Sequence, residues 1–321
     1  MGSLANTYQT NTTDYGRLIA AGYHANLFVV NPAVAGADII TNGGFNTYNA
    51  LQIEVNRRLA SGLLVQGSYV WAKSLGEGGQ PTTLRNRGLD KGPANNDIRD
   101  AFKINGLYQL PIGAGRQFLS TTPVVKKILE GWEISGINRM QSGAVFALSS
   151  GRDGMDGSGS GVVLENITLK QLQNDISIQK VTPTQTAGAT NPGQVLWLPP
   201  SLVTNTNAAF ESNGQSWSTL NTSAPYIGPQ LAPGTYGYEV NLRNPWQYHF
   251  DAAILKRTRI KERIDTELQV NFDNILNYNN FLLSNGPSST SFGKTTSAYN
   301  DLSYNYDSGA RTIEIRLHIR F

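Results

Sequence analysis

Strict alternation of apolar and polar residues marks the end of the chain. From residue 312 to residue 321 every second side chain is apolar, and those between are polar or charged. The apolar set, which closes on an aromatic ring, is Ile313, Ile315, Leu317, Ile319 and Phe321. A period of two predicts a β-strand with unlike faces. The charged polar face and the terminal ring favour a strand with lipid on one side and water on the other.

The same alternation recurs upstream, which predicts six further strands. They span residues 48–59, 63–74, 98–110, 132–141, 246–259 and 265–276. The short breaks at 60–62 and 260–264 predict two hairpins. Most of these segments run about 10 to 14 residues, whereas a globular strand has ~5–6 and a tilted membrane-crossing strand needs ~9–11. The lengths therefore favour strands that cross a membrane.

The connections between the predicted strands alternate between short and long. The long ones are residues 75–97, 142–245 and 277–311. Outer-membrane barrels have short periplasmic turns and long extracellular loops, while compact soluble domains rarely carry structureless connections beyond ~15 residues. The pattern predicts an all-β fold, an antiparallel transmembrane β-barrel, with 142–245 as a large extracellular loop. Within that loop, Thr168 is placed to cap a short helix over 169–176.

Aromatic residues gather near both ends of the predicted strands, as expected for girdles at the two membrane interfaces. The outer girdle would hold Tyr48, Trp71, Phe102, Trp246 and Tyr248. The inner girdle would hold Tyr108, Trp132 and Phe321.

Composition removes several other classes of protein. Charged residues make up 15% of the chain, against about 25% in soluble globular domains, and uncharged polar residues with 33 Gly take their place. No run reaches the ~18 apolar residues of a membrane-spanning helix, which excludes a helical membrane protein. A net charge of +3 gives no reason to expect nucleic acid as a partner.

Cofactor, metal and catalytic sites are not expected. Cysteine is absent and the three histidines share no ligand spacing, which argues against zinc. The glycine-rich stretch 151–161 lacks the spacing of a calcium loop. No nucleophile elbow is present, and Glu267 and Asp273 would lie about 20 Å apart along one strand, so no enzyme is expected.

Charged residues also fall on the predicted inward faces, with two alternative roles. These are Arg58, Lys103, Glu133, Arg139, Glu267, Asp273, Glu314, Arg316 and Arg320. They either line a path for a plug or a solute, or simply pair with one another across neighbouring strands.

Several stretches resemble one family along most of the chain. They are "FNTYNALQIEVNRRLASGLLVQGSYVWAKSL" from Phe45, "NDIRDAFKINGLYQLPIGAGRQF" from Asn96, "LEGWEISGINRMQSGAVF" from Leu129, "NITLKQLQNDISI" from Asn166 and "FDAAILKRTRIKERIDTELQVNFDNILNYNNF" from Phe250. In this order they resemble the C-terminal part of the barrel of TonB-dependent receptors, especially the Oar-like branch with a carboxypeptidase-regulatory-like domain. The resemblance implies active uptake of an unidentified solute across the bacterial outer membrane.

The resemblance also sets expectations for partners. Such receptors have barrels of about 22 strands around a plug, and bacterial barrels have even strand numbers. Seven readable strands therefore suggest a fragment, with residues 45–321 as the C-terminal barrel portion and 1–44 as an extracellular loop or partial strand. Residues 17–30 are a candidate eighth strand. The expected partners are outer-membrane lipid, the barrel-assembly machinery reading the final strand and Phe321, and the TonB complex through a plug that this sequence lacks.

The solute itself is not readable, but the large loop is where it would first bind. Its candidate contact rings are Trp197, Trp217 and Tyr226, although loop aromatics also pack against one another. Two alternatives to the receptor segment stay open: a secreted carbohydrate-binding β-sandwich and a small autonomous outer-membrane pore.

Overall fold

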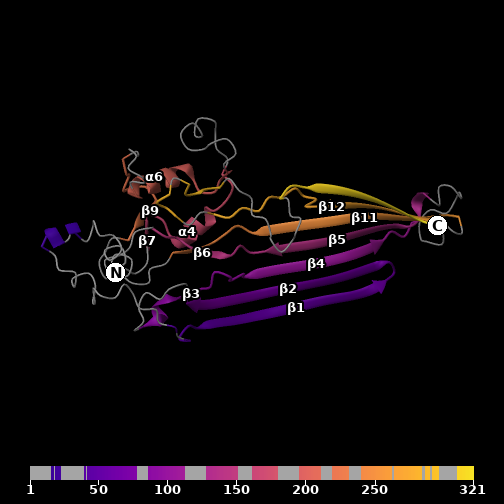
Figure 1. The fold of residues 1–321 in the computed structure, drawn as a ribbon, viewed down its shortest axis with the longest axis horizontal. Helices are drawn as coiled ribbons and strands as arrows, with labels where there is room; N and C mark the ends of the chain where they lie inside the picture. Colours follow the sequence, from indigo (N-terminus) through magenta and orange to yellow (C-terminus); the bar gives the residue numbers. More distant parts are fainter. Residues whose placement is uncertain are drawn as a thin grey trace.

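The computed structural model shows one long antiparallel sheet with a folded cap at one end (Figure 1). It describes residues 16–17, 19–22, 40, 42–77, 86–112, 128–150, 161–179, 195–210, 219–230, 240–261, 264–283, 286–289, 291–295 and 309–321.

Seven long strands follow one another across the sheet in chain order. They are β1 (Asn46–Ala60), β2 (Leu63–Glu77), β4 (Asp100–Gln109), β5 (Trp132–Gln141), β11 (Gln247–Lys261), β12 (Ile264–Asp273) and β14 (Thr312–Arg320). Each is antiparallel to the next, and the short β3 (Lys91–Pro93) pairs with β2. All seven predicted strands and both predicted hairpins are confirmed. The sheet is not closed, because β1 and β14 form its two edges.

The turns explain where the strands stop. Ser61 and Gly62 both have positive φ, 53° and 80°, as a two-residue hairpin turn requires. At the end of β12, Asn274 has a φ of 48° and its side chain exchanges two hydrogen bonds of 3.0 Å with the backbone of Tyr278. This turn ends β12 at Asp273, so the predicted continuation to residue 276 is wrong.

The two faces of the sheet have opposite character. The apolar face carries the odd-numbered residues of β1 up to Arg57, of β2 and of β14, and the even-numbered residues of β4, β5, β11 and β12, as the strand registers show. The polar face carries the others. Apolar-face side chains such as Val55 and Ile315 remain 62% and 69% exposed. A soluble sandwich would bury such a face beneath a second sheet, so that alternative is wrong.

The connection between β5 and β11 folds into the cap, defined as the described residues of 142–246 together with 291–295. Its elements are β6 (Val145–Ala147), β7 (Val162–Glu165), α4 (Leu169–Asn174), β8 (Val195–Leu196), α6 (Pro200–Phe210), β9 (Tyr226–Pro229), β10 (Asn241–Arg243) and β13 (Lys294–Thr295). They pair as β6–β10, β7–β9 and β8–β13. The last pair joins the β12–β14 connection to the cap. A 3₁₀-helix, η2 (Arg87–Asp90), lies outside it in the β2–β3 connection.

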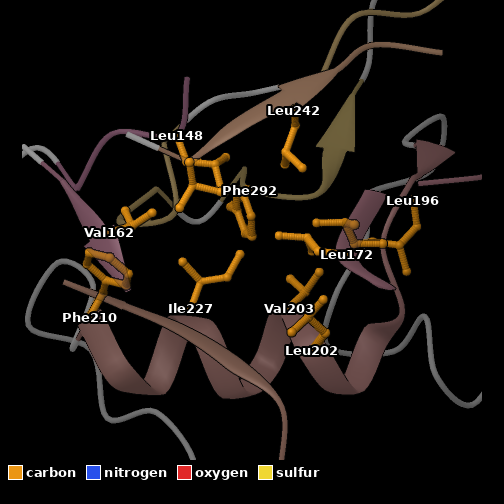
Figure 2. Close-up of a cluster of buried hydrophobic side chains, with 12 residues drawn as sticks. Leu148, Val162, Leu172, Leu196, Leu202, Val203, Phe210, Ile227, Leu242 and Phe292 are labelled. Carbon is orange, nitrogen blue, oxygen red and sulfur yellow. The ribbon is translucent and has the colours of Figure 1, made fainter. Parts of the chain in front are cut away.

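The cluster of buried apolar side chains lies in the cap and not in the long sheet (Figure 2). Phe292, from the β12–β14 connection, lies near its centre and is 1% exposed. Around it stand side chains of α4, α6 and the short strands, including Leu172, Val203 and Ile227. The cap therefore has its own hydrophobic core, whereas the long sheet has none among the described residues.

The helix expected inside the large loop is confirmed as α4. Thr168 accepts from the backbone of Gln171, and the Gln171 side chain accepts from the backbone of Thr168, which completes a capping box. The helix α6 was not predicted, although Pro200 at its first position is a known start signal.

Near the N-terminus, the described residues 16–17 and 19–20 are helical. The candidate eighth strand is therefore wrong at its start, Arg17, and residues 23–30 lie outside the described residues. No helix in the described part of the chain is long and apolar enough to cross a membrane.

Candidate functional site: a two-faced wall and its cap

The final strand presents its apolar residues without cover. Ile313, Ile315, Leu317 and Ile319 of β14 all lie on the apolar face and are more than half exposed. Phe321 follows the strand and is 97% exposed. The residues expected to act as the barrel-assembly signal thus form one continuous, accessible edge. Their recognition by assembly machinery stays a prediction.

Five of the predicted girdle residues lie on the apolar face: Trp71, Phe102, Tyr108, Trp132 and Tyr248. Trp246 precedes β11 and stacks on Tyr248 with ring centroids 6.3 Å apart. We term the end of the sheet nearer the cap the loop end. There the ring of Phe102 stacks on that of Tyr69, with ring centroids 4.3 Å apart. The grouping of rings at both strand ends is thus present, and their place at membrane interfaces stays a prediction.

Tyr48 does not belong to this set. It lies opposite Ser74 on the polar face of β1, since it shares the even parity of Gln52 and Glu54. Its assignment to the outer girdle is therefore wrong.

Tyr278 is an aromatic residue that the sequence analysis missed. Its ring meets that of Tyr248 edge-on, with ring centroids 5.1 Å apart, and burial raises the pKa of its phenol. It follows the turn at Asn274, where no strand period could have indicated its position.

Charged residues on the polar face of β11, β12 and β14 pair mainly across strands. Arg257 lies between two carboxylates, 3.1 Å from Glu267 and 3.8 Å from Glu133. Arg259 and Asp265 are 2.9 Å apart. On β14 itself, Arg316 lies 2.7 Å from Glu314. These contacts favour the interpretation as mutually paired wall residues in this part of the sheet.

Three basic residues lie opposite one another near the loop end of the polar face. Lys103 of β4 is directly opposite Arg139 of β5, which is directly opposite His249 of β11. His249 Nε2 lies 3.0 Å from Asp251 on its own strand, and the other oxygen of Asp251 accepts the backbone N–H of Asn274 at 2.9 Å. We call Lys103, Arg139 and His249 the basic row.

A cavity of about 560 Å³ opens at the far end of the sheet from the cap, the turn end. Its charged lining includes Glu133, Arg257, Asp265, Glu267 and Arg320, so both signs of charge meet there. Most of these residues belong to the cross-strand pairs above, which leaves a polar, charge-balanced hollow.

A buried ion pair fastens the cap to the loop end of the sheet. Asp97, in the β3–β4 connection, is 1% exposed and pairs with the guanidinium of Arg243 in β10. Asp97 also accepts the backbone N–H of Ser74 in β2 at 2.5 Å, and its carbonyl accepts from Arg243 at 2.8 Å. Gln173 of α4 holds the backbone of Arg243 through hydrogen bonds of 2.7 and 3.1 Å. One arginine therefore ties sheet, cap strand and cap helix together.

The three predicted solute contacts in the large loop differ in how accessible the structure shows them to be. Trp197 is 3% exposed and packs edge-on against Phe281 at 5.7 Å, so it belongs to the cap interior and its assignment as an accessible contact ring is wrong. Tyr226 is half-buried at the start of β9, where it pairs with Glu165. Trp217 lies outside the described residues.

The described residues show no metal-binding group of three or more His, Asp or Glu side chains. His249 and His318 both lie on the polar face. His249 lies beside the carboxylate of Asp251 and opposite Arg139 of the neighbouring strand. The arrangement offers charge and hydrogen-bond donors for binding.

Comparison with known proteins agrees with this geometry. No curated protein and no solved structure matches the chain. A family model described as an outer membrane beta barrel domain matches residues 2–313, nearly the whole chain. The exposed apolar face, the polar opposite face and the length of the strands are what that architecture requires. The chain therefore belongs to the outer membrane beta barrel domain family, and it is located in the bacterial outer membrane.

Proposed function

We propose that this chain forms part of the wall of a larger barrel, in a receptor that takes up a solute with energy relayed by TonB. The observation that carries the proposal is the open sheet. Its edge strands β1 and β14 do not pair with each other. In lipid, each unpaired backbone N–H or C=O costs several kcal/mol, so a barrel must close. Further strands beside β1 and β14 would close it.

The cap supports a receptor over a plain pore. It is a folded unit with its own apolar core, and a buried ion pair with additional hydrogen bonds fastens it to the loop end of the sheet. A passive pore needs no such structure over its mouth. A capped mouth suits a protein that recognises a solute before admitting it. The TonB part of the proposal rests on the resemblance of the segments quoted above.

The proposed partners follow from the surfaces. Lipid would cover the apolar face, and the assembly machinery would read β14 and Phe321. The TonB complex would act through a plug segment outside this sequence, and the solute would enter beneath the cap. Neither a catalytic reaction nor nucleic-acid binding forms part of the proposal.

The closure of the barrel is tested on the native protein. Outer membranes of the source cells are separated, and an antibody against the cap detects the species on denaturing gels. A band several-fold heavier than 34.9 kDa is expected. A 34.9 kDa species in the outer membrane would refute the larger barrel and favour a small autonomous pore.

The TonB step needs a separate measurement. Formaldehyde cross-linking in living cells, followed by detection with antibodies against TonB and against the cap, should give one species that both antibodies recognise. A strain lacking TonB is the control. Absence of that species, with a heavy band present, would refute TonB dependence while leaving the barrel wall intact.

A further inference from the structure

Arg311 is a positively charged residue on the lipid side of the sheet, at its loop end. It directly precedes β14 and has the odd parity of Ile313, which lies on the apolar face. The residue is exposed. In the described part of the chain its guanidinium has one acceptor, the carbonyl of Ile275 at 3.4 Å, and no carboxylate forms an ion pair with it. Unlike the basic row, Arg311 therefore offers its charge on the outside of the wall.

The turn that follows β12 holds Arg311 in place. The side-chain amide of Asn274, which is 4% exposed, donates to the carbonyls of Tyr278 and Gly309, each at 3.0 Å. The side chain of Asn277, in the same turn, accepts the backbone N–H of Arg311 at 3.1 Å. These bonds tie the backbone before β14 to the turn after β12, so Arg311 lies beside that turn in a fixed position.

Aromatic rings lie on the same side of the wall, next to the turn. Tyr278 meets Tyr248 edge-on, and Tyr248 stacks on Trp246. Asn280 fixes the backbone of Tyr248 through hydrogen bonds of 2.9 and 3.0 Å. Trp246 and Tyr278 keep 40% and 36% of their surface exposed, and Leu276 of the turn is 62% exposed. A cation, accessible ring surface and an apolar side chain therefore occur together. We call this set the rim corner: Arg311, Leu276, Tyr248, Tyr278 and Trp246.

The position of the rim corner limits what can bind there. Barrels of this architecture have their long connections outside the cell, so the loop end lies at the outer leaflet of the membrane. Interfacial rings mark the level at which acyl chains give way to headgroups. A solute that passes along the polar face does not meet the rim corner, because the wall lies between them. Lipid is therefore the occupant, and a basic residue at headgroup level favours a lipid whose headgroup is anionic.

We propose that the rim corner binds a phosphorylated glycolipid of the outer leaflet. The guanidinium of Arg311 forms paired hydrogen bonds with the oxygens of a phosphate on the sugar. The exposed ring surface of Trp246 and Tyr278 packs against the apolar C–H groups of the sugar rings. Leu276 lies against the first part of an acyl chain. A plain phospholipid matches the charge and the chain but offers no sugar to the rings. The proposal concerns the outside of the wall and does not depend on uptake or on TonB.

The test uses the full-length protein, purified from the outer membrane and freed of bound lipid by detergent exchange. Native mass spectrometry measures its affinity for lipid A, for lipid A without its phosphates and for phosphatidylglycerol, and inorganic phosphate is added as a competitor. The variants are Arg311→Gln and Tyr278→Leu. The matched control is Arg316→Gln, which removes the same charge from the polar face of β14, where Arg316 pairs with Glu314. Unchanged heat-dependent gel migration shows that each variant is folded.

Phosphorylated lipid A should bind the unaltered protein about tenfold more tightly than its phosphate-free form, since the bonds to phosphate are charge-assisted. Arg311→Gln should bind lipid A about tenfold more weakly and no longer distinguish the two forms, while the control stays within about twofold. Tyr278→Leu should weaken the binding of lipid A and leave that of phosphatidylglycerol unchanged, because only lipid A has sugars for the ring to contact.

Three results would each overturn the proposal: absence of lipid A binding to the unaltered protein, equal affinity in Arg311→Gln, or an equal loss in Arg316→Gln. Displacement of lipid A by inorganic phosphate would assign the site to a free anion and would overturn it as well. An equal loss of lipid A and phosphatidylglycerol in Tyr278→Leu would overturn the sugar contact. None of these measurements involves TonB, so the glycolipid site is tested separately from the proposed uptake.

Discussion

Replacing Arg243 with glutamine should loosen the cap from the sheet. The substitution removes the guanidinium that pairs with Asp97 and donates to its carbonyl, while Ser74 still donates to the carboxylate. Because Asp97 is 1% exposed, its charge is left buried and only partly compensated. Breaking a buried ion pair from one side costs about 3–5 kcal/mol. Since the Arg243 side chain is 25% exposed, the lower value of about 3 kcal/mol applies.

A loss of about 3 kcal/mol in the stability of the contact between cap and sheet should be measurable as more frequent local opening of that contact. Every 1.4 kcal/mol is a factor of ten, so about 3 kcal/mol predicts roughly a hundredfold larger open fraction at the seam between cap and sheet. Hydrogen exchange of the Ser74 amide, which bonds to Asp97, measures that fraction directly. Protease cleavage of the cap in intact cells should rise in parallel if opening is fast relative to cleavage.

A second substitution tests the electrostatic reasoning. Asparagine at position 97 still accepts the Ser74 N–H but carries no charge, so the double variant Asp97→Asn with Arg243→Gln should open less than Arg243→Gln alone. A double-mutant cycle gives the interaction energy of the pair. Two results would refute the argument. One is a Ser74 amide exchange rate in Arg243→Gln within twofold of that of the unaltered protein. The other is an exchange rate in the double variant no lower than that in Arg243→Gln.

One deletion and two substitutions test the wall and the cap separately. Deleting Phe321 should reduce outer-membrane insertion of the full-length protein, as measured by the folded band in membrane fractions; unchanged insertion would remove its assembly role. Leu317→Arg places a charge on the lipid side of β14 and should destabilise the barrel by about 2–4 kcal/mol in denaturant unfolding from lipid vesicles; an effect no larger than that of Arg316→Leu would contradict the assignment of faces. Phe292→Ala should cost about 3–5 kcal/mol and expose the cap to protease; a cap of unaltered protease resistance would show that Phe292 is not central to its core.

The long strands were predictable because one face of the sheet is apolar and the other is polar along its whole length. Exposed apolar residues such as Val55 and Ile315 alternate with polar neighbours along their strands. Within the described part of the chain, no second layer packs on this face and disturbs the period. Strand order was equally accessible, since consecutive segments pair in sequence. Tyr48 was assigned to the girdle because it lies near the end of its strand. Its even number, however, places it on the polar face, opposite Ser74.

The cap was not predictable by the same means. Its strands are two to four residues long, too short to show a period, and α6 contains Thr204, Asn205, Thr206 and Asn207 in succession, which are poor helix formers. Burial of Asn205 and Thr206 is made possible by hydrogen bonds to residues 221, 225 and 227, which no local pattern indicates. Asp97 and Arg243 are 146 positions apart, so their pairing depends on the completed fold.

The way the cap joins the wall explains how one chain can contain both. Gln141 and Gln247, the last residue of β5 and the first of β11, are opposite each other, and their side-chain amides are joined by a hydrogen bond of 2.7 Å. The intervening residues therefore leave and re-enter the sheet at one point, and the register of β5 with β11 does not depend on their length. The wall is stabilised by lipid on its apolar face, whereas the cap is stabilised by its own buried cluster in water. Because the two parts depend on different surroundings, substitutions in the buried cluster of the cap should leave the pairing of the wall strands unchanged.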